Sequence, residues 1–386
     1  MDIMNFLKTT MIAGTSLMML VSCGQSRDIA VKEGSEVGFA LSFFRSVLAN
    51  SSATDNVSVS PYSAGVALSM LSEGASGVTL EELDKALAGC RLKPEDLSDT
   101  DSVVIKSANA LWTDSGFSVK DSFVSGLAED YDAMAESIDF SSPSAVGRMN
   151  GWARENTEGK IDNIVAQLTP DMVAIIANAL YFKAPWDTPF ESRNTREGIF
   201  HGVSGDADVS FMNRTGGYEY AEFAGNQMVR IPYWGERFAM TVLLPAEGEN
   251  AGDMEQYVNE KGMEQALERL QYTRIKLRMP EFRIENSCSL IPALQSMGVK
   301  SAFTSKAELG GIADGPLAVS EVNQKTYLNV SEAGSEAAAV TTVAISLTSV
   351  RDDRAIPVME IDRPFYYMIS DTRTGRIYFI GRIVNL

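Results

Sequence analysis

Apolar residues recur at helical spacing in the first half of the chain and in continuous or alternating runs in the second half. Residues 35–49 carry apolar side chains three or four positions apart, which predicts a helix. Ser60 and Pro61 favour the start of a second helix, as N-cap and first helical residue. Thr79 and Glu82 have the spacing of a capping box, which predicts a helix from residue 79 to 87. The remaining helices are predicted over residues 121–130, 145–158 and 287–298.

Strand patterns dominate the later part of the chain. Residues 171–183 form a long apolar run, which is typical of a strand buried on both faces. The last two strands, 364–370 and 376–384, are predicted to pair as a hairpin around residues 371–375. The mixture of early helices and late strands indicates the α+β class. Further strands are predicted over residues 57–59, 107–112, 228–232, 238–245, 274–284 and 317–330.

Residues 334–346 read as a strand without a partner. Small residues come first and β-branched residues follow, and one alternating face is formed by Ser335, Ala337, Ala339, Thr341, Val343 and Ile345. No turn pairs the segment with a neighbour, and residues 347–357 are polar and charged, as in an exposed loop. A helix that begins at Ser335 is the alternative, although Thr341, Thr342 and Val343 interrupt it.

Composition indicates one large globular domain over residues 35–386. The chain has 386 residues, of which 45% are hydrophobic and 22% charged, and no linker or repeat divides it. The net charge of −18 would repel a phosphate backbone, so nucleic acid is not expected as a partner. We expect a monomer.

The N-terminus has the pattern of a signal peptide. Residues 1–22 carry one lysine and an apolar run, and the sequence Leu20-Val21-Ser22-Cys23 resembles a bacterial lipoprotein cleavage box. The resemblance implies that Cys23 becomes lipidated, that residues 23–34 form a tether, and that the protein is anchored in a bacterial cell envelope, at the outer membrane or cell surface. A plain secretory signal with an incidental cysteine is the alternative. Cys90 and Cys288 are expected as buried free thiols, with a single disulfide left open.

Catalytic and metal-binding patterns are missing from the sequence. His201 is the single histidine, so a Ser-His-Asp site would have to use it, and no Gly-x-Ser-x-Gly motif occurs. Cys90, Cys288 and His201 lie far apart without the paired spacing of metal ligands. We therefore expect no enzyme, no metal and no cofactor, and a structural role for His201.

Residues Glu332-Ala333-Gly334-Ser335-Glu336-Ala337-Ala338-Ala339 resemble the reactive-loop hinge of the serpins, a family of protease inhibitors. The resemblance extends over nearly all of residues 35–386. It implies the serpin fold, with three β-sheets, about eight or nine helices and an exposed reactive-centre loop. Other matching segments are 56–63, 157–161, 178–183, 194–197 with 200–201, and 362–365, together with Trp186.

The resemblance implies suicide inhibition of a serine protease. The protease attacks the loop and forms an acyl-enzyme, and the cut loop then inserts into the main sheet as a central strand. Family spacing implies cleavage between Thr348 and Ser349, which suits elastase-like or subtilisin-like proteases, with Leu347, Val350 and Arg351 as alternatives. A non-inhibitory binding or substrate-like member, and an inhibitor that also traps papain-like cysteine proteases, remain alternatives.

Two further regions are implied by the resemblance. Ser60, Ser63 and Asn178 match the shutter, a polar region that bridges the central strands; the family's histidine there is replaced by Gln324, which can both donate and accept. Trp186 matches the breach, where insertion begins. There the family's lysine is replaced by Glu281, opposite Glu332, and two like charges favour an easily opened breach unless Arg283 intervenes.

Overall fold

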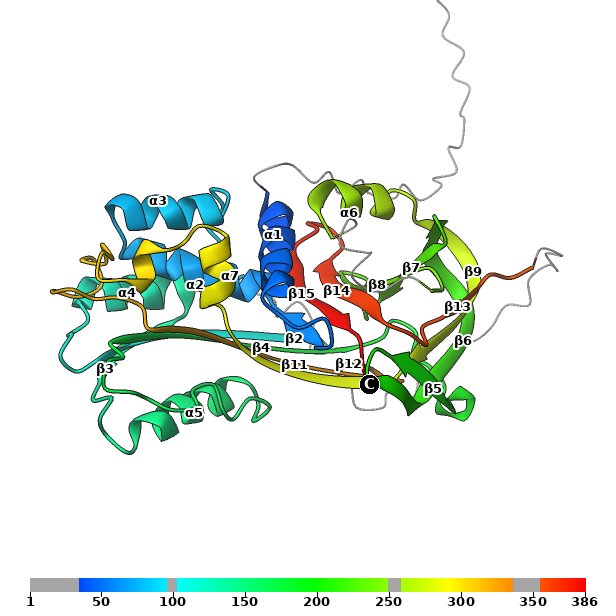
Figure 1. Cartoon of the computed structure of the whole chain (residues 1–386). Coiled ribbons are helices and arrows are strands. Elements are labelled where there is room, and N and C mark those ends of the chain that lie inside the picture. Colours follow the sequence, from blue (N-terminus) through cyan, green and yellow to red (C-terminus); the bar gives the residue numbers. More distant parts are fainter. Residues whose placement is uncertain (1–34, 96–102, 249–257, 336–354) are drawn as a thin grey trace, which may run out of the picture.

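Two β-sheets, covered by helices, make up the part of the chain described here, in a computed structural model (Figure 1). That part comprises residues 35–95, 103–248, 258–335 and 355–386. Its helices are α1 (Glu36–Ala49), α2 (Pro61–Glu73), α3 (Gly77–Ala86), α4 (Asp121–Tyr131), α5 (Ala145–Asn156), α6 (Glu260–Leu267) and α7 (Ile291–Ser296), with short 3-10 helices η1 (Ser192–Asn194) and η3 (Ser301–Phe303). The α+β class is confirmed.

A six-stranded sheet forms the centre of the molecule, in the order β10-β11-β12-β4-β2-β3. One face packs with α2 on the main hydrophobic core, and α5 covers the other face (Figure 1). Successive residues of β4 therefore enter two different cores, which confirms the predicted strand buried on both faces. Its strands are β2 (Val104–Asp114), β3 (Met134–Ile138), β4 (Ala174–Pro185), β10 (Phe282–Ser289), β11 (Glu321–Ser331) and β12 (Gly334–Ser335).

A nine-stranded sheet occupies the other half of the molecule. Its long strand β6 pairs with β5 at one end and with β7 at the other, and with β9 between them. The resemblance implies three sheets; because β6 and β9 run continuously, the strands described here form two hydrogen-bonded sheets. The strands are β1 (Val57–Val59), β5 (Arg196–Gly202), β6 (Gly205–Phe223), β7 (Asn226–Pro232), β8 (Phe238–Leu244), β9 (Gln271–Pro280), β13 (Val358–Glu360), β14 (Phe365–Asp371) and β15 (Ile377–Ile383).

Several predicted elements are confirmed. Ser60 caps α2, because its hydroxyl accepts a hydrogen bond from the backbone N–H of Ser63 at 3.0 Å. The C-terminal hairpin is present as β14 and β15, and the predicted pair 228–232 and 238–245 as β7 and β8.

The predicted capping box at Thr79 is wrong. Helix α3 begins two residues earlier, at Gly77. The Thr79 hydroxyl instead lies 2.9 Å from that of Ser301 and accepts from the Glu308 N–H, and the Glu82 carboxylate accepts from two backbone N–H groups at Lys300 and Ser301. Both side chains thus join α3 to a distant segment rather than capping the helix.

The predicted strand 274–284 and helix 287–298 are also corrected. The chain leaves the nine-stranded sheet after Pro280 and enters the six-stranded sheet at Phe282, so the segment contains two strands, β9 and β10. Strand β10 continues to Ser289, and α7 is limited to Ile291–Ser296. Proline lacks a backbone N–H and therefore suits the point where one ladder ends.

The two cysteines in the described ranges, Cys90 and Cys288, form no disulfide with each other and are half-buried rather than buried. Burial nevertheless raises the pKa of the Cys288 thiol to about 11. Within the same ranges, every helix is too short or too polar to cross a membrane.

Candidate functional site

The first two hinge residues already lie between β4 and β11. Ser335 is opposite Ala184 of β4 and Val330 of β11, and Gly334 is opposite Pro185 and Ser331. Figure 1 shows their strand, β12, beside β4 and β11. Beyond this point β4 and β11 pair directly with each other, in parallel. The prediction of a strand is thus confirmed for its first two residues. We call the end where β12 separates β4 and β11 the open end of the sheet, and the part where β4 and β11 pair directly the closed part.

Glycine is required at position 334. Its φ is +142°, a conformation that side chains with a Cβ rarely adopt. A Cβ there would lie 2.2 Å from the Ala184 carbonyl oxygen and 2.6 Å from the Pro185 Cα. Any other residue would displace the hinge from the opening.

An aromatic stack holds Ser335. The fully buried Ser335 hydroxyl lies 2.7 Å from the Tyr233 hydroxyl. The ring of Tyr233 stacks on Trp186, with centroids 4.5 Å apart and planes 10° from parallel. The Trp186 indole N–H donates to the Ser331 carbonyl at 2.9 Å. Trp186 therefore contacts the hinge region directly, and Tyr233, which sequence reasoning missed, connects it to the hinge strand.

A buried polar network joins α2 to the closed part of the sheet. The Gln324 amide accepts from the Ser60 N–H and donates to the Ser60 carbonyl, both at 2.9 Å. Gln324 also donates to the Asn178 amide oxygen at 2.9 Å, across the β4–β11 pair. Asn178 in turn donates to the Ser63 carbonyl at 3.0 Å and to the Ser63 hydroxyl. The structure thus brings Ser60, Ser63, Asn178 and Gln324 together, without a titrating member among them.

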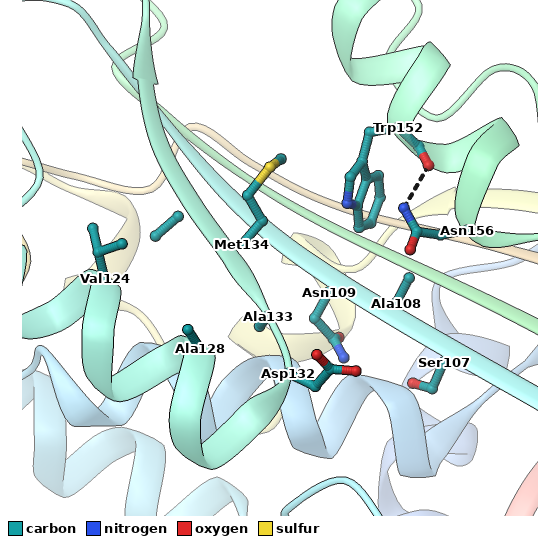
Figure 2. Close-up of a pocket in the computed structure, with 11 residues that line it drawn as sticks. Ser107, Ala108, Asn109, Val124, Ala128, Asp132, Ala133, Met134, Trp152 and Asn156 are labelled. Atoms are coloured by element: carbon teal, nitrogen blue, oxygen red, sulfur yellow. Dashed lines mark hydrogen bonds between the residues drawn. The ribbon is translucent and has the colours of Figure 1, made fainter. Parts of the chain in front are cut away.

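Strand β2 supplies two members that the sequence did not suggest. Asn109 accepts from Asn178 at 2.6 Å, and the Ser107 hydroxyl lies 3.1 Å from that of Ser63. Both residues also line a surface pocket of about 410 Å³, where β2 meets α4, β3 and α5; Figure 2 shows Asp132 and Trp152 on its other sides. The network therefore runs from α2 across the neighbouring strands β11, β4 and β2 to a solvent-accessible pocket.

Two carboxyl groups meet at the open end of the sheet. Glu281 and Glu332 form a side-chain hydrogen bond. Burial and then the Glu332 carboxyl raise the pKa of Glu281 to about 7, and the bond from Glu281 lowers the pKa of Glu332. Arg283 donates to Glu285 and lies over the Tyr327 ring, 5.1 Å from its centroid. The two carboxyl groups that the resemblance places together therefore do meet, but the raised pKa of Glu281 favours its neutral form, so they are not simply two like charges.

Several predicted site residues lie outside the described part of the chain. These are Cys23, the hinge residues Glu336, Ala337, Ala338 and Ala339, and the reactive-bond candidates Leu347, Thr348, Ser349, Val350 and Arg351.

His201 is exposed at the β5–β6 turn, where its Nδ1 lies 2.9 Å from a carboxylate oxygen of Asp206. Within the described ranges, no three histidine, cysteine or acidic side chains gather as a metal site would require. The site described here is built around β12, which lies between β4 and β11 where these two parallel strands separate.

A family model for the serpins, described as serine protease inhibitors, matches residues 35–386. The chain belongs to the serpin family. An uncharacterized serpin-like protein of Thermococcus kodakarensis is 33% identical over 377 residues, covering 92% of this chain and 87% of that protein. The family acts by inhibiting proteases rather than by catalysis.

Solved serpin structures have the same fold. The thermophilic serpin tengpin in its native state is 27% identical, with a TM-score of 0.81 and coverage of 91% of this chain and 93% of its own. Human thyroxine-binding globulin complexed with its hormone has a TM-score of 0.81 at 24% identity, covering 92% of this chain and 99% of its own. The latter likeness concerns the fold alone.

Proposed function

We propose that this serpin is a suicide inhibitor of elastase-like or subtilisin-like serine proteases. The protease forms an acyl-enzyme with the loop, and the freed N-terminal part of the loop inserts between β4 and β11 before the ester is hydrolysed. A fully inserted strand of about fourteen residues spans about 46 Å. The attached protease is carried that distance, and its active site is distorted.

The register of the open sheet supports this mechanism. Where β4 and β11 pair directly, Asn178 is opposite Gln324. Where β12 separates them, Ala184 and Val330 lie opposite the same β12 residue, so the alignment of β4 with β11 is unchanged. The two strands therefore only have to move apart sideways, without sliding along each other. This constant register is the observation that carries the proposal.

The loop sequence fits the space that such an opening would create. Continuing the β12 ladder sets Ala337 opposite Phe182 and Leu328, and Thr341 opposite Asn178 and Gln324. Inward side chains of the inserted strand would be small or β-branched and would join a fully buried core. At Thr341, a hydroxyl group would arrive where the Asn178–Gln324 hydrogen bond must break, and it can both donate and accept.

Cleavage is proposed between Thr348 and Ser349, with Leu347, Val350 and Arg351 as alternatives. We expect the protein lacking residues 1–22 to form a band of summed mass on a denaturing gel with elastase or subtilisin. Sequencing the released C-terminal fragment would give Ser349 as its first residue. The same experiment with trypsin tests Arg351, and with papain tests trapping of cysteine proteases.

Heat-inactivated protease serves as the control for the gel. Cleavage in the loop without a band of summed mass, and with the protease still active, would contradict the inhibitor proposal. It would favour a binding or substrate-like serpin instead.

We further propose that Cys23 carries a lipid that anchors the protein in a bacterial cell envelope. The sequence Leu20-Val21-Ser22-Cys23 supports this proposal. Expressed in a bacterium fed radiolabelled palmitate, the full chain should incorporate label, and Cys23→Ser should not. Equal labelling of both proteins would contradict the anchor.

A further inference from the structure

Three acidic side chains gather where the sheet opens. Glu281 lies in the link between β9 and β10, Glu332 in the link between β11 and β12, and Glu197 on β5. Because Phe282 is opposite Val330, Glu281 lies directly beside the turn that starts the hinge strand. The backbone N–H of Glu281 donates to Ser210 of β6 at 2.8 Å, which fixes it to the nine-stranded sheet. The Glu281–Glu332 bond thus ties that sheet to the hinge.

The bond requires a proton. Two ionised carboxylates have only acceptors, so they can form a hydrogen bond only when one of them is protonated. Glu332 already accepts from the Thr195 hydroxyl at 2.9 Å and from Ser192, which favours its ionised form. Glu281 is therefore the member that carries the proton, and Glu197 adds a further negative charge facing it.

Cations on the neighbouring elements have other partners. Arg193 of η1 pairs with Glu191, and Arg196 of β5 donates to the carbonyl groups of Arg193 and Thr195. Arg214 of β6 donates to the Thr188 carbonyl, Arg278 of β9 pairs with Glu360, and Arg283 of β10 pairs with Glu285. The charge of an ionised Glu281 would thus face the Glu332 and Glu197 carboxylates, with the backbone N–H of Glu332 as a donor whose effect is smaller than theirs and that of burial.

We propose that Glu281 and Glu332 form a proton-controlled latch on the hinge. With the proton present, the latch holds the hinge link against the nine-stranded sheet; without it, the two carboxylates repel each other and the open end of the main sheet loosens. The latch acts on the insertion step of the proposed function. The polar network around Gln324 has no titrating side chain, so its hydrogen bonds do not depend on pH. The pH-sensitive part of the mechanism is therefore the breach, at Glu281 and Glu332.

The sign of the pH effect follows from linkage. Glu281 has a raised pKa in the folded protein, about 7 against an ordinary 4.5, so the folded state holds more protons than the unfolded state between these values. Its contribution to stability is present below pH 4.5 and is lost as the pH rises towards 7. We expect the equilibrium constant for unfolding to rise about 10-fold between pH 5 and pH 8, because partial exposure to solvent weakens the coupling.

Urea unfolding of the full chain at pH 5, 6, 7 and 8 tests the latch. Glu281→Gln keeps a hydrogen-bond donor towards Glu332 at every pH, so it should remove this pH dependence and be more stable than the wild type at pH 8. Glu155→Gln, which removes an exposed carboxylate on α5 and leaves the Arg283–Glu285 pair intact, is the matched control and should keep the dependence. A wild type without the dependence, or a Glu281→Gln protein that retains it, would overturn the proposal.

Spontaneous insertion gives a second readout. Incubated at 37 °C, the wild type should convert to a urea-resistant form several-fold faster at pH 8 than at pH 6, and Glu281→Gln should convert equally at both. If the unfolding result is as expected but neither the intact protein nor the protein cut in its loop becomes urea-resistant, the latch is supported and the insertion mechanism fails. Faster conversion at pH 6 than at pH 8 would overturn the latch.

Discussion

Replacing Ala337 by arginine should turn the protein from an inhibitor into a substrate of the proteases that it traps. Continuing the β12 ladder puts this side chain opposite Phe182 and Leu328, both with 0% exposure. A charge without a partner in such a core costs several kcal/mol. If about 3 kcal/mol of that cost raises the barrier to insertion, insertion slows about 100-fold. Hydrolysis of the acyl-enzyme is then faster than insertion, and the protease is released.

The measurement is the ratio of covalent complex to cleaved protein on a denaturing gel. Asp353→Arg is the matched control: it adds the same side chain on the C-terminal side of the Thr348–Ser349 bond, in the part that does not insert. It should form complex as the wild type does. An equal yield of complex from Ala337→Arg would mean that the loop does not enter the sheet in the register proposed here.

Local patterns in the sequence were sufficient to predict the helices and strands around the open end of the six-stranded sheet. They were less informative about the contacts between those elements. Burial on both faces makes β4 an unbroken apolar run, and a proline after a capping serine marks the start of α2. The hinge is recognisable because Gly334, where a Cβ would collide with β4, is followed in the sequence by a run of small residues. Such requirements act on consecutive residues and therefore leave a pattern.

Contacts between distant segments leave no such pattern. Tyr233 directly follows β7 and forms a β-bridge with Trp186, and its role depends on Trp186 and Ser335, both far away in sequence. The 19-residue strand β6 has an irregular order of buried and exposed residues because its two halves meet different partners, so alternation did not reveal it. Thr79 and Glu82 have the spacing of a capping box, but their side chains form hydrogen bonds with residues 300–308 instead of capping α3.

Cleavage of the loop should make the protein markedly more stable, although a peptide bond has been lost. In the proposed mechanism the uncut loop is tied at both ends, at Gly334 and Pro364, and cutting it frees residues 336–345 to enter the sheet. Burial of the inward side chains of Ala337, Ala339, Thr341, Val343 and Ile345 contributes about 1 kcal/mol each or more. With about 1.4 °C per kcal/mol for a domain of about 350 residues, the midpoint of thermal unfolding should rise by about 7 °C or more.

Circular dichroism of the protein before and after limited proteolysis measures this shift. Cleaved Ala337→Arg is the control, because it contains the same broken bond and cannot insert fully; it should gain little. A wild type whose midpoint stays the same or falls after cleavage would mean that the separated end of the loop remains outside the sheet. Since both proteins are cut at the same bond, the difference between their midpoints isolates insertion from cleavage, and it does so without any protease being trapped.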